Sequence, residues 1–420
     1  MHRIIAAVLV AGACASSAHA QTSPPTGTAP VLTFNDALAR AGATSPAQEA
    51  AAAAIRAAEA QRRVANLRPN PSIVAETENV AGSGIYQGLR SSETTVGLAL
   101  PLELGGKRSA RVAVASAQLS RAALDAEIAR ADLRLRVTQA YNEASAAERR
   151  LVIARQQVGI AAEALRAAQV RVRAGRASPL EEQRADVARI AADGAAERAA
   201  RSAEVASGNL ARLLSTPVTA LDLSWFDRVE GAGPPRPVTA GSTLAAAAAR
   251  ADLSTATAQI RLARSQRVPD VTVSASARRL EQTNDVAAVF GVSIPLAVFN
   301  RGRAAVDVST AQRDQADALR RVALLDAEQA IAQAQAEAAN AATTARNASG
   351  PALAAAQEAA RIARIGYREG KFGQLDLLDA ERTLSDTRTA AIDALAAYHD
   401  AQARLERLTT PAPTVTEDNR

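Results

Sequence analysis

The sequence predicts a mainly α-helical protein with a small β part, built from two copies of one structural plan. An alternating apolar segment, Thr94 to Leu100, runs into a turn at 101–108 and then into about 66 residues without proline. The same context recurs roughly 195 residues later, at 294–303. Aromatic residues are 2% of the chain and alanine is abundant, so the interior suits closely approaching helices rather than a thick globular core.

The first twenty residues predict a signal peptide. A short basic start at His2 and Arg3 precedes an apolar stretch and a small-x-small cleavage site ending at Ala20. The apolar stretch is shorter than the roughly 20 residues that a membrane-spanning helix needs. Lipid attachment at Cys14 remains an alternative to plain cleavage, although the residue three positions before it is not the usual leucine.

The mature chain lacks the residues that most cofactor sites require. It contains no Cys and no Met after residue 20, and its only histidine is His399. Disulfides and soft metal sites are therefore excluded, and no nucleophile–base arrangement can be assembled. We expect no enzyme activity, no cofactor and no metal site, with His399 as a solvated or interhelix side chain.

The charge pattern argues against nucleic-acid binding. Forty-nine basic and 43 acidic residues give a net charge of +6, and removal of Arg3 with the signal segment leaves +5. The arginines are interleaved with acids along the expected helices, which is typical of solvated helix faces. The Gly105–Arg108 segment is not a phosphate-binding loop, because it lacks the upstream glycine and the Ser or Thr after Lys107.

The first repeat is expected at 21–214, in the order helix, strand pair, long helix, return helix. An amphipathic helix from Phe34 to Leu67 leads to a proline-containing segment, and period-two apolar patterns then predict strands around 71–80 and 91–101. A 4–3 apolar spacing from Leu133 to Val172 predicts a coiled-coil helix, which at 1.5 Å per residue would span roughly 100 Å.

Both repeats are expected to end in a helical tip and a return helix. In the first, the long helix stops at Gly175, and Ser178 with Pro179 starts the return helix to Leu214. A linker at 215–241 separates the repeats. The second repeat, at 242–409, has the following expected elements: a helix from Thr243 to Val268, strands at 269–278 and 287–297, a long helix kinked at Gly350-Pro351 and ending at Gly370, and a return helix from Gln374 to Leu408. A disordered tail at 410–420 is expected to follow it.

The four expected strands point to an oligomer. An alternating face carrying Val96, Leu98, Leu100, Val292 and Ile294 is expected to face lipid. Four strands cannot close into a barrel, and an open edge cannot lie in lipid. Two chains would supply eight strands and three chains twelve, and these arguments leave the number open.

This plan resembles the TolC-like outer membrane efflux proteins over essentially the whole mature chain. The likeness rests on Arg68-Pro69-Asn70-Pro71, on the turn from Pro101 to Arg108, on the doubled element order, and on the tip from Gly370 to Ala380. The turn is most similar to the subfamily of heavy-metal efflux pumps of the resistance-nodulation-division class. The resemblance implies a homotrimer with a twelve-stranded barrel in the outer membrane, in contact with lipid, and a helical tunnel in the periplasm.

The resemblance also implies a gate at the periplasmic tips. Asp376 and Asp379 match a pair of aspartates that narrow and charge the mouth, and their spacing puts them on one helix face. Tyr367 and Glu181 match two members of the closed-state lock. Its arginine position holds Phe372 beside Lys371, which puts the lock's details in doubt. The expected adaptor contacts are these tip residues: Gly175, Ser178, Pro179, Gly370 and Gly373.

The expected function is a passive outer-membrane duct of a tripartite efflux pump, exporting heavy-metal cations. Its partners would be a periplasmic adaptor, or membrane fusion protein, and an inner-membrane pump of the same class. One alternative is the same duct serving drug or solvent efflux or type I protein secretion. Another, of a different class, is a soluble periplasmic coiled-coil scaffold.

Overall fold

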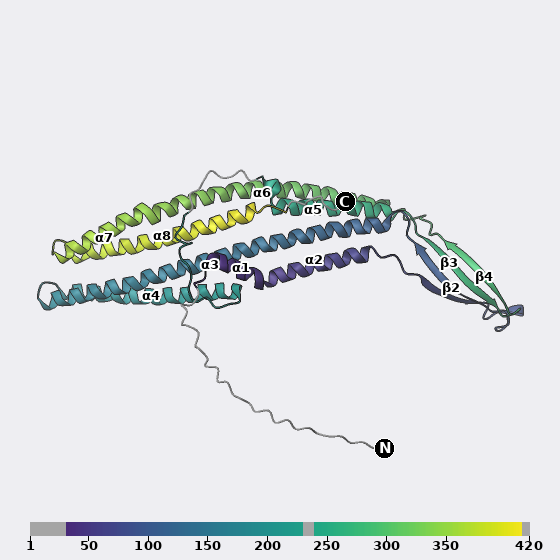
Figure 1. Cartoon of the computed structure of the whole chain (residues 1–420), viewed down its shortest axis with the longest axis horizontal. Helices are drawn as coiled ribbons and strands as arrows, with labels where there is room; N and C mark the ends of the chain where they lie inside the picture. Colours follow the sequence, from purple (N-terminus) through teal and green to yellow (C-terminus); the bar gives the residue numbers. More distant parts are fainter. Residues whose placement is uncertain (1–30, 230–238, 414–420) are drawn as a thin grey trace, which may run out of the picture.

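The computed structural model describes residues 31–229 and 239–413 (Figure 1). The expected signal peptide, Cys14 and the last part of the expected tail lie outside the described residues. In chain order the helices and strands are α1 (Phe34–Thr44), α2 (Pro46–Ala65), β1 (Ser72–Glu78), β2 (Glu93–Leu102), α3 (Lys107–Arg173), α4 (Pro179–Leu214), α5 (Leu244–Ser265), β3 (Val271–Leu280), β4 (Asp285–Ser293), α6 (Arg303–Asn347), α7 (Leu353–Arg368) and α8 (Gln374–Thr409).

The molecule is elongated, with the sheet at one end and two helical tips at the other (Figure 1). Helix α3 runs from the sheet to one tip, where α4 folds back along it. The second repeat reaches its tip through α6 and α7 together, and α8 returns beside them. Helices α2 and α5 lie along the sheet-proximal halves of α3 and α6. This arrangement confirms a mainly helical fold built on a doubled plan.

The four strands form one antiparallel sheet in the order β1-β2-β3-β4. Leu98 lies opposite Ile73 on β1 and Ala275 on β3, and Ala275 lies opposite Phe290 on β4. The large apolar side chains of this face on β2 and β4 are exposed, from 41% at Leu100 to 81% at Phe290. The expected alternation is therefore present, and β1 and β4 have no strand partner at their outer edges among residues 31–229 and 239–413.

The opposite face of the sheet is polar near its far end. Arg278 donates to the Thr95 hydroxyl at 3.0 Å and forms ion pairs with Glu93 at 2.9 Å and Glu78 at 3.1 Å. Gly97 lies on this face, and a Cβ there would come within 2.4 Å of the Ser276 Cβ. The two faces therefore differ sharply in polarity, as expected for a sheet with lipid on one side and water on the other.

The long helices pack through small side chains. The buried positions of α3 include Leu133, Val137, Ala144, Ala147 and Leu151. In α6 the buried residues are Ile331 and four alanines: Ala334, Ala338, Ala342 and Ala345. Alanine seams let helix backbones approach closely, and most of these residues occupy the predicted 4–3 positions.

Three expected features differ in form or extent in the structure. The helix expected from Phe34 to Leu67 is two helices, because the chain is extended at Ser45 and Pro46 begins a new helix. Gly350-Pro351 interrupts the second long helix as expected, and the break takes the form of a π-helical turn at Ala348–Ala352. The disordered tail is expected from residue 410, but the residues at its start are ordered, since the Ala412 amide donates to the Ser242 carbonyl at 2.9 Å.

An aromatic cluster ties the segment after α4 to the middle of the helices. The Trp225 ring stacks on Phe34 at 4.5 Å and lies 4.1 Å from the His399 ring, centroid to centroid. The Tyr141 hydroxyl lies 2.7 Å from the Asp222 carbonyl, and burial raises the pKa of this phenol. His399 is buried, with Nε2 2.9 Å from the Phe226 carbonyl, so it joins α8 to the non-helical segment after α4 and is not a solvated side chain. Residues 215–229 are thus packed against the helices.

None of the helices in 31–229 and 239–413 combines the length and apolar character required to span a membrane.

Candidate functional site at the helical tips

The first tip connects α3 to α4 through a tight glycine turn. Gly175 has a φ of +68°, a conformation that favours glycine, and nothing lies within 4 Å of a Cβ built on it. The Ser178 hydroxyl accepts a hydrogen bond from the Leu180 amide at 3.2 Å, and Pro179 occupies the first helical turn. The turn is therefore set by local backbone chemistry and leaves its outer surface open.

The second tip connects α7 to α8 and carries the two aspartates. Gly370 has a φ of +74° and is equally open, and Gly373 is the N-cap of α8. The Asp376 carboxylate accepts a hydrogen bond from the Gly373 amide at 2.9 Å. Asp379 lies one turn further along the helix. Both aspartates are exposed, and neither forms an ion pair with another described residue.

Two contacts between the tips join the two repeats within one chain. The Arg171 guanidinium lies over the Tyr367 ring, 4.9 Å from its centroid, a cation–π geometry. The Gln374 side-chain amide donates to the Glu181 backbone carbonyl at 3.2 Å. Each contact bridges the α3–α4 hairpin and the α7–α8 hairpin.

The expected lock residues are not brought together within the chain. Lys371 forms an ion pair with Glu369 at 2.7 Å, on its own tip. The Glu181 Oε2 atom is buried and has no hydrogen-bond partner among the described residues. A contact among Glu181, Tyr367 and Lys371 therefore remains a prediction about the assembled protein.

Phe372 has a packing role at the second tip. Its ring lies against Gly366, where a Cβ would approach the Phe372 Cδ2 atom to 2.2 Å. Further from the tip along α7, Arg364 forms a two-point ion pair with the buried carboxylate of Glu381, with Nη2 2.8 Å from Oε2. This pair fastens α7 to α8, so the hairpin is held firmly while its turn stays open.

Sequence reasoning missed Arg171, Gln374, Arg364 and Glu381. An arginine four residues before Gly175 looks like an ordinary solvated residue, because the sequence does not say which helix lies across from it. Gln374 is the first residue of α8, and nothing in its sequence position points to a partner on the other hairpin. The sequence therefore marked the turns but not the contacts that connect them.

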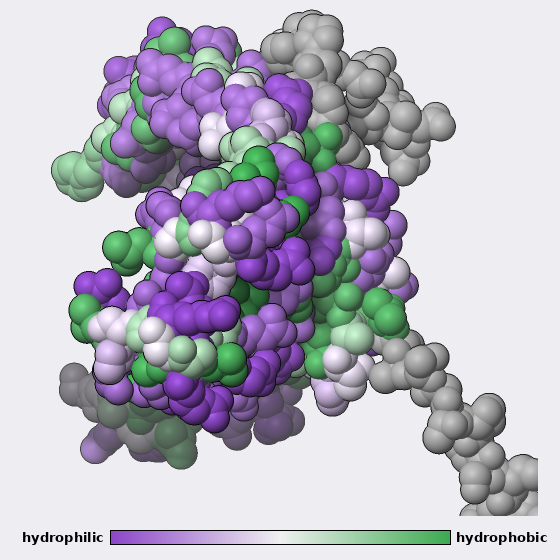
Figure 2. All heavy atoms as spheres, turned by 90° about the vertical axis from the view of Figure 1, so that its left-hand side faces the viewer, coloured by the Kyte–Doolittle hydropathy of each residue, from purple (hydrophilic) through white to green (hydrophobic). Residues whose placement is uncertain are grey.

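The tip surface is mixed rather than uniformly charged. Figure 2 looks at this end of the molecule and shows hydrophilic residues interspersed with apolar ones. The exposed apolar side chains include Leu180 and Leu375, at 53% and 64%, and Phe372 at 42%. Such a surface suits contact with another protein, because apolar anchors alternate with solvated groups. The described residues contain no group of three metal-ligating side chains.

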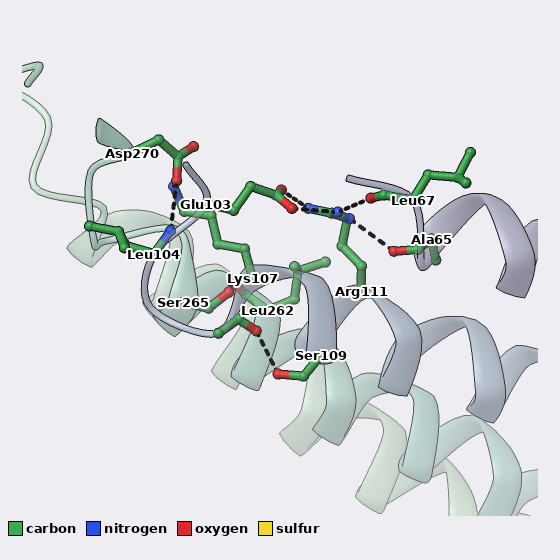
Figure 3. Close-up of polar contacts among 11 residues, drawn as sticks. Ala65, Leu67, Glu103, Leu104, Lys107, Ser109, Arg111, Leu262, Ser265 and Asp270 are labelled. Carbon is green, nitrogen blue, oxygen red and sulfur yellow. Dashed lines mark hydrogen bonds and ion pairs between the residues drawn. The ribbon is translucent and has the colours of Figure 1, made fainter. Parts of the chain in front are cut away.

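At the other end, the turn that stood out in the sequence locks the sheet to the helices (Figure 3). Arg111 forms a two-point ion pair with Glu103, one arm of which measures 3.0 Å from Nη2 to Oε2. The same guanidinium donates to the carbonyls of Ala65 and Leu67, at 3.4 and 3.2 Å. It therefore caps the C-terminus of α2 while anchoring the start of α3.

A second ion pair crosses this junction. Lys107 Nζ lies 2.7 Å from an Asp270 oxygen, which also accepts the Leu104 amide at 3.2 Å. Burial alone would raise the pKa of Asp270, but these donors and the charge of Lys107 hold it below its usual range. Hydrogen bonding from Arg111 likewise lowers the pKa of Glu103. Both carboxylates are thus stabilised as anions.

Comparison with known proteins identifies the family. The sequence profile described as "Outer membrane efflux protein" matches residues 37–216 and 243–410. The chain belongs to the outer membrane efflux protein family. It is therefore an outer-membrane efflux channel whose helices extend into the periplasm.

Two curated relatives are metal-resistance proteins of Cupriavidus metallidurans. The cobalt-zinc-cadmium resistance protein CzcC is 29% identical over 90% of each chain. The nickel and cobalt resistance protein CnrC is 31% identical over 75% of this chain and 74% of its own.

Solved outer-membrane channels share the fold. The open state of the MtrE outer membrane channel of Neisseria gonorrhoeae has a TM-score of 0.74 at 23% identity, covering 90% of this chain and 88% of MtrE. CusC has the same TM-score at 18% identity and covers 90% of this chain and 92% of its own.

Proposed function

We propose that this protein is the exit duct of a tripartite efflux pump and that it works as a homotrimer. The observation that carries the proposal is the sheet, which has an exposed apolar face and two unpaired edges at one end of a long helical body. Pairing β4 of one chain with β1 of the next would satisfy the free backbone groups. Three chains would supply twelve strands and enclose a wet passage.

We propose heavy-metal cations as the cargo, supported by the names of the relatives. The protein would act as a passive conduit, without a catalytic step or cofactor. Choice of metal would rest with an inner-membrane pump of the resistance-nodulation-division class, because the mature chain has no Cys, no Met and only a buried His399. A periplasmic adaptor would contact the tips around Gly175, Ser178, Pro179, Gly370 and Gly373.

The gate proposal rests on the aspartates and on the two contacts between the tips. In a trimer, Asp376 and Asp379 would contribute six carboxylates to one narrow opening, attracting cations and repelling anions. The capping bond from Gly373 to Asp376 fixes one carboxylate at the helix start. Opening would separate Arg171 from Tyr367 and Gln374 from Glu181, because those pairs connect the two hairpins of one chain.

The test is metal resistance in cells that lack their own duct. Cells with the matching pump and adaptor should regain growth in cobalt, zinc, cadmium or nickel when the parent is expressed. The variant with Gly175→Val and Gly370→Val should reach the outer membrane but lose resistance, because a β-branched residue is strained at positive φ. Full resistance of that variant would refute the tip assignment. If the parent restores only drug efflux or protein secretion, and not metal resistance, that cargo would replace heavy-metal cations in the proposal.

The gate is tested separately in a planar bilayer. Replacing Asp376 and Asp379 by Asn should remove the preference for cations and the block by trivalent cations, with insertion unchanged. Unchanged preference and block would show that these aspartates are ordinary solvated residues. A soluble periplasmic scaffold, the alternative of another class, predicts that no protein fractionates with the outer membrane and that no channel appears.

A further inference from the structure

Unpaired arginines gather where the helices meet the sheet. Four segments converge there: the ends of α2 and α5 and the starts of α3 and α6 (Figure 1). We call six of their arginines the arginine collar: Arg68, Arg108, Arg264, Arg267, Arg301 and Arg303. All six are exposed, and the structure gives none of their guanidinium groups a hydrogen bond or ion pair with another described residue.

The charge at this end exceeds that of the whole chain. The four converging segments contain eleven basic residues and two acids, an excess of nine positive charges, against a net charge of +6 for all 420 residues. Both acids are already used, Glu103 by Arg111 and Asp270 by Lys107. The segments in question are 61–70, 103–111, 261–270 and 294–303. The acids of these four segments thus leave the collar arginines unbalanced, and the rest of the chain is net negative.

An apolar loop lies directly beside the collar. Residues 294–299 follow β4 and expose large apolar side chains, with Leu296 at 82% and Phe299 at 100%. Ile294 and Leu296 continue the alternation of Phe290 and Val292, which lie on the apolar face of the sheet. Two residues after Phe299 the first collar arginine, Arg301, begins the basic region. The surface therefore changes abruptly from apolar to basic along one stretch of chain.

We propose that the arginine collar binds the phosphate headgroups of anionic phospholipids in the periplasm-facing leaflet, while the 294–299 loop enters the adjoining acyl region. The proposal rests on the membrane placement of the sheet in the proposed function. Guanidinium groups match phosphate oxygens in two-point hydrogen bonds. An anionic leaflet attracts basic segments at its surface, and aromatic side chains are enriched at membrane–water interfaces. The collar would fix the depth at which the sheet sits.

The experiment compares lipids and two matched variants. Purified protein in neutral detergent is titrated with phosphatidylglycerol or phosphatidylcholine, and its thermal midpoint and bound lipids, by native mass spectrometry, are recorded. The collar variant carries Arg264→Gln, Arg267→Gln, Arg301→Gln and Arg303→Gln. The control removes four exposed arginines without ion pairs near the tips: Arg155→Gln, Arg166→Gln, Arg176→Gln and Arg184→Gln.

The parent and the control should be stabilised by phosphatidylglycerol and not by phosphatidylcholine, and high salt should abolish the difference. The collar variant should bind phosphatidylglycerol at least about tenfold more weakly. Equal stabilisation by both lipids, or an equal loss in the control variant, would overturn the proposal.

If the collar variant fails to assemble, the smaller variant with Arg301→Gln and Arg303→Gln is used. Assembly failure in that variant as well would mean that the collar contacts a second copy of the chain, and the lipid proposal would be rejected. Normal fractionation with the outer membrane but no lipid preference would reject only this inference. Absence from the outer membrane would reject the proposed function itself.

Discussion

The two repeats join strand to helix in different ways. In the first, four residues separate β2 from α3, and two ion pairs cross the connection, Arg111–Glu103 and Lys107–Asp270. In the second, nine residues separate β4 from α6. The Gly302 amide in that longer connection donates to the Asn300 side-chain oxygen at 3.0 Å, and the Val298 amide donates to the Leu296 carbonyl at 2.9 Å. One junction is locked, and the other is a long loop with exposed apolar residues.

The difference shows that two copies of one structural plan can be stabilised by different side-chain contacts. Both junctions place a glycine at positive φ just before the helix, Gly106 at +71° and Gly302 at +68°. The shared backbone feature sets the turn in both cases. Among the described residues, ion pairs that connect separate elements occur at the first junction and not at the second, so the first junction fixes the sheet relative to the helices. The second is left free to contact its surroundings.

The largest expected effect is at Arg111. Arg111→Ala removes a two-point ion pair and leaves Glu103 and two carbonyls at the end of α2 without their donor, at a cost of about 3 kcal/mol. The control change at the second junction is Arg303→Ala, at an exposed arginine whose side chain forms no ion pair with another described residue, and it should cost less than about 0.5 kcal/mol. Thermal dissociation in detergent without acidic lipid measures both. Equal losses would mean that the junctions do not differ in rigidity.

The next effect compares two glycines of like conformation. Gly105 has a φ of +70°, and a Cβ there would lie 2.7 Å from Val268 and 3.0 Å from the Ser265 carbonyl. At Gly302 the close atom is the Cγ of Arg267, part of a flexible side chain, at 2.8 Å. Both alanine variants carry the left-handed penalty of about 1 kcal/mol, and Gly105→Ala should cost at least about 1 kcal/mol more. Matching midpoints for the two variants would contradict the difference in packing.

A smaller effect concerns pH. The pKa of Glu103 is lowered chiefly by its hydrogen bond from Arg111, so its stabilisation is fully present above the ordinary glutamate pKa of about 4.3. It is lost as the pH falls through the lower pKa of the folded state. Glu103→Gln should therefore be less stable than the parent near neutral pH, and the gap should narrow below about pH 4. A gap that stays constant down to pH 3 would show that this carboxylate is not held as an anion.

The smallest effect is expected in the second loop. Asn300→Ala removes one exposed hydrogen bond and should change stability by less than about 0.5 kcal/mol. Phe299→Ser, at a fully exposed position, should be equally mild in detergent. In bilayers containing phosphatidylglycerol, Phe299→Ser should weaken the retention of the protein in the bilayer more than Asn300→Ala does. A large loss of stability in detergent for either variant would show that this loop contacts another part of the assembled protein.

Several features could be read directly from local pattern. The alternation through Val96, Leu98 and Leu100 predicted the apolar face of β2, and the register bears it out. The alanine seam through Ala144 and Ala147 predicted which side of α3 is buried. Such patterns are reliable because the strand and helix periods are set by the backbone itself.

The two boundary errors have different causes, one local and one long-range. Pro46 follows a serine and starts a helix, yet the uninterrupted apolar spacing around it favoured one long helix over two. The ordered residues after α8 bond to the start of α5, a partner that lies far away in the sequence. Neither feature changes the spacing of apolar residues at a helical period of 3.6 residues, so that spacing does not predict them.

The sequence by itself determined the doubled order of elements, the two glycine tips, and the strand-to-helix turns, because each depends on neighbouring residues and on backbone conformations that glycine and proline restrict. Only the tertiary structure decided that Arg171 meets Tyr367, that Arg111 caps α2, and that His399 is buried beside Trp225. Each of those contacts joins elements far apart in the chain. Which residues meet depends on the lengthwise alignment and the rotation of one long helix against another. An alanine-rich seam has the same small side chain at many positions, so it does not specify that alignment.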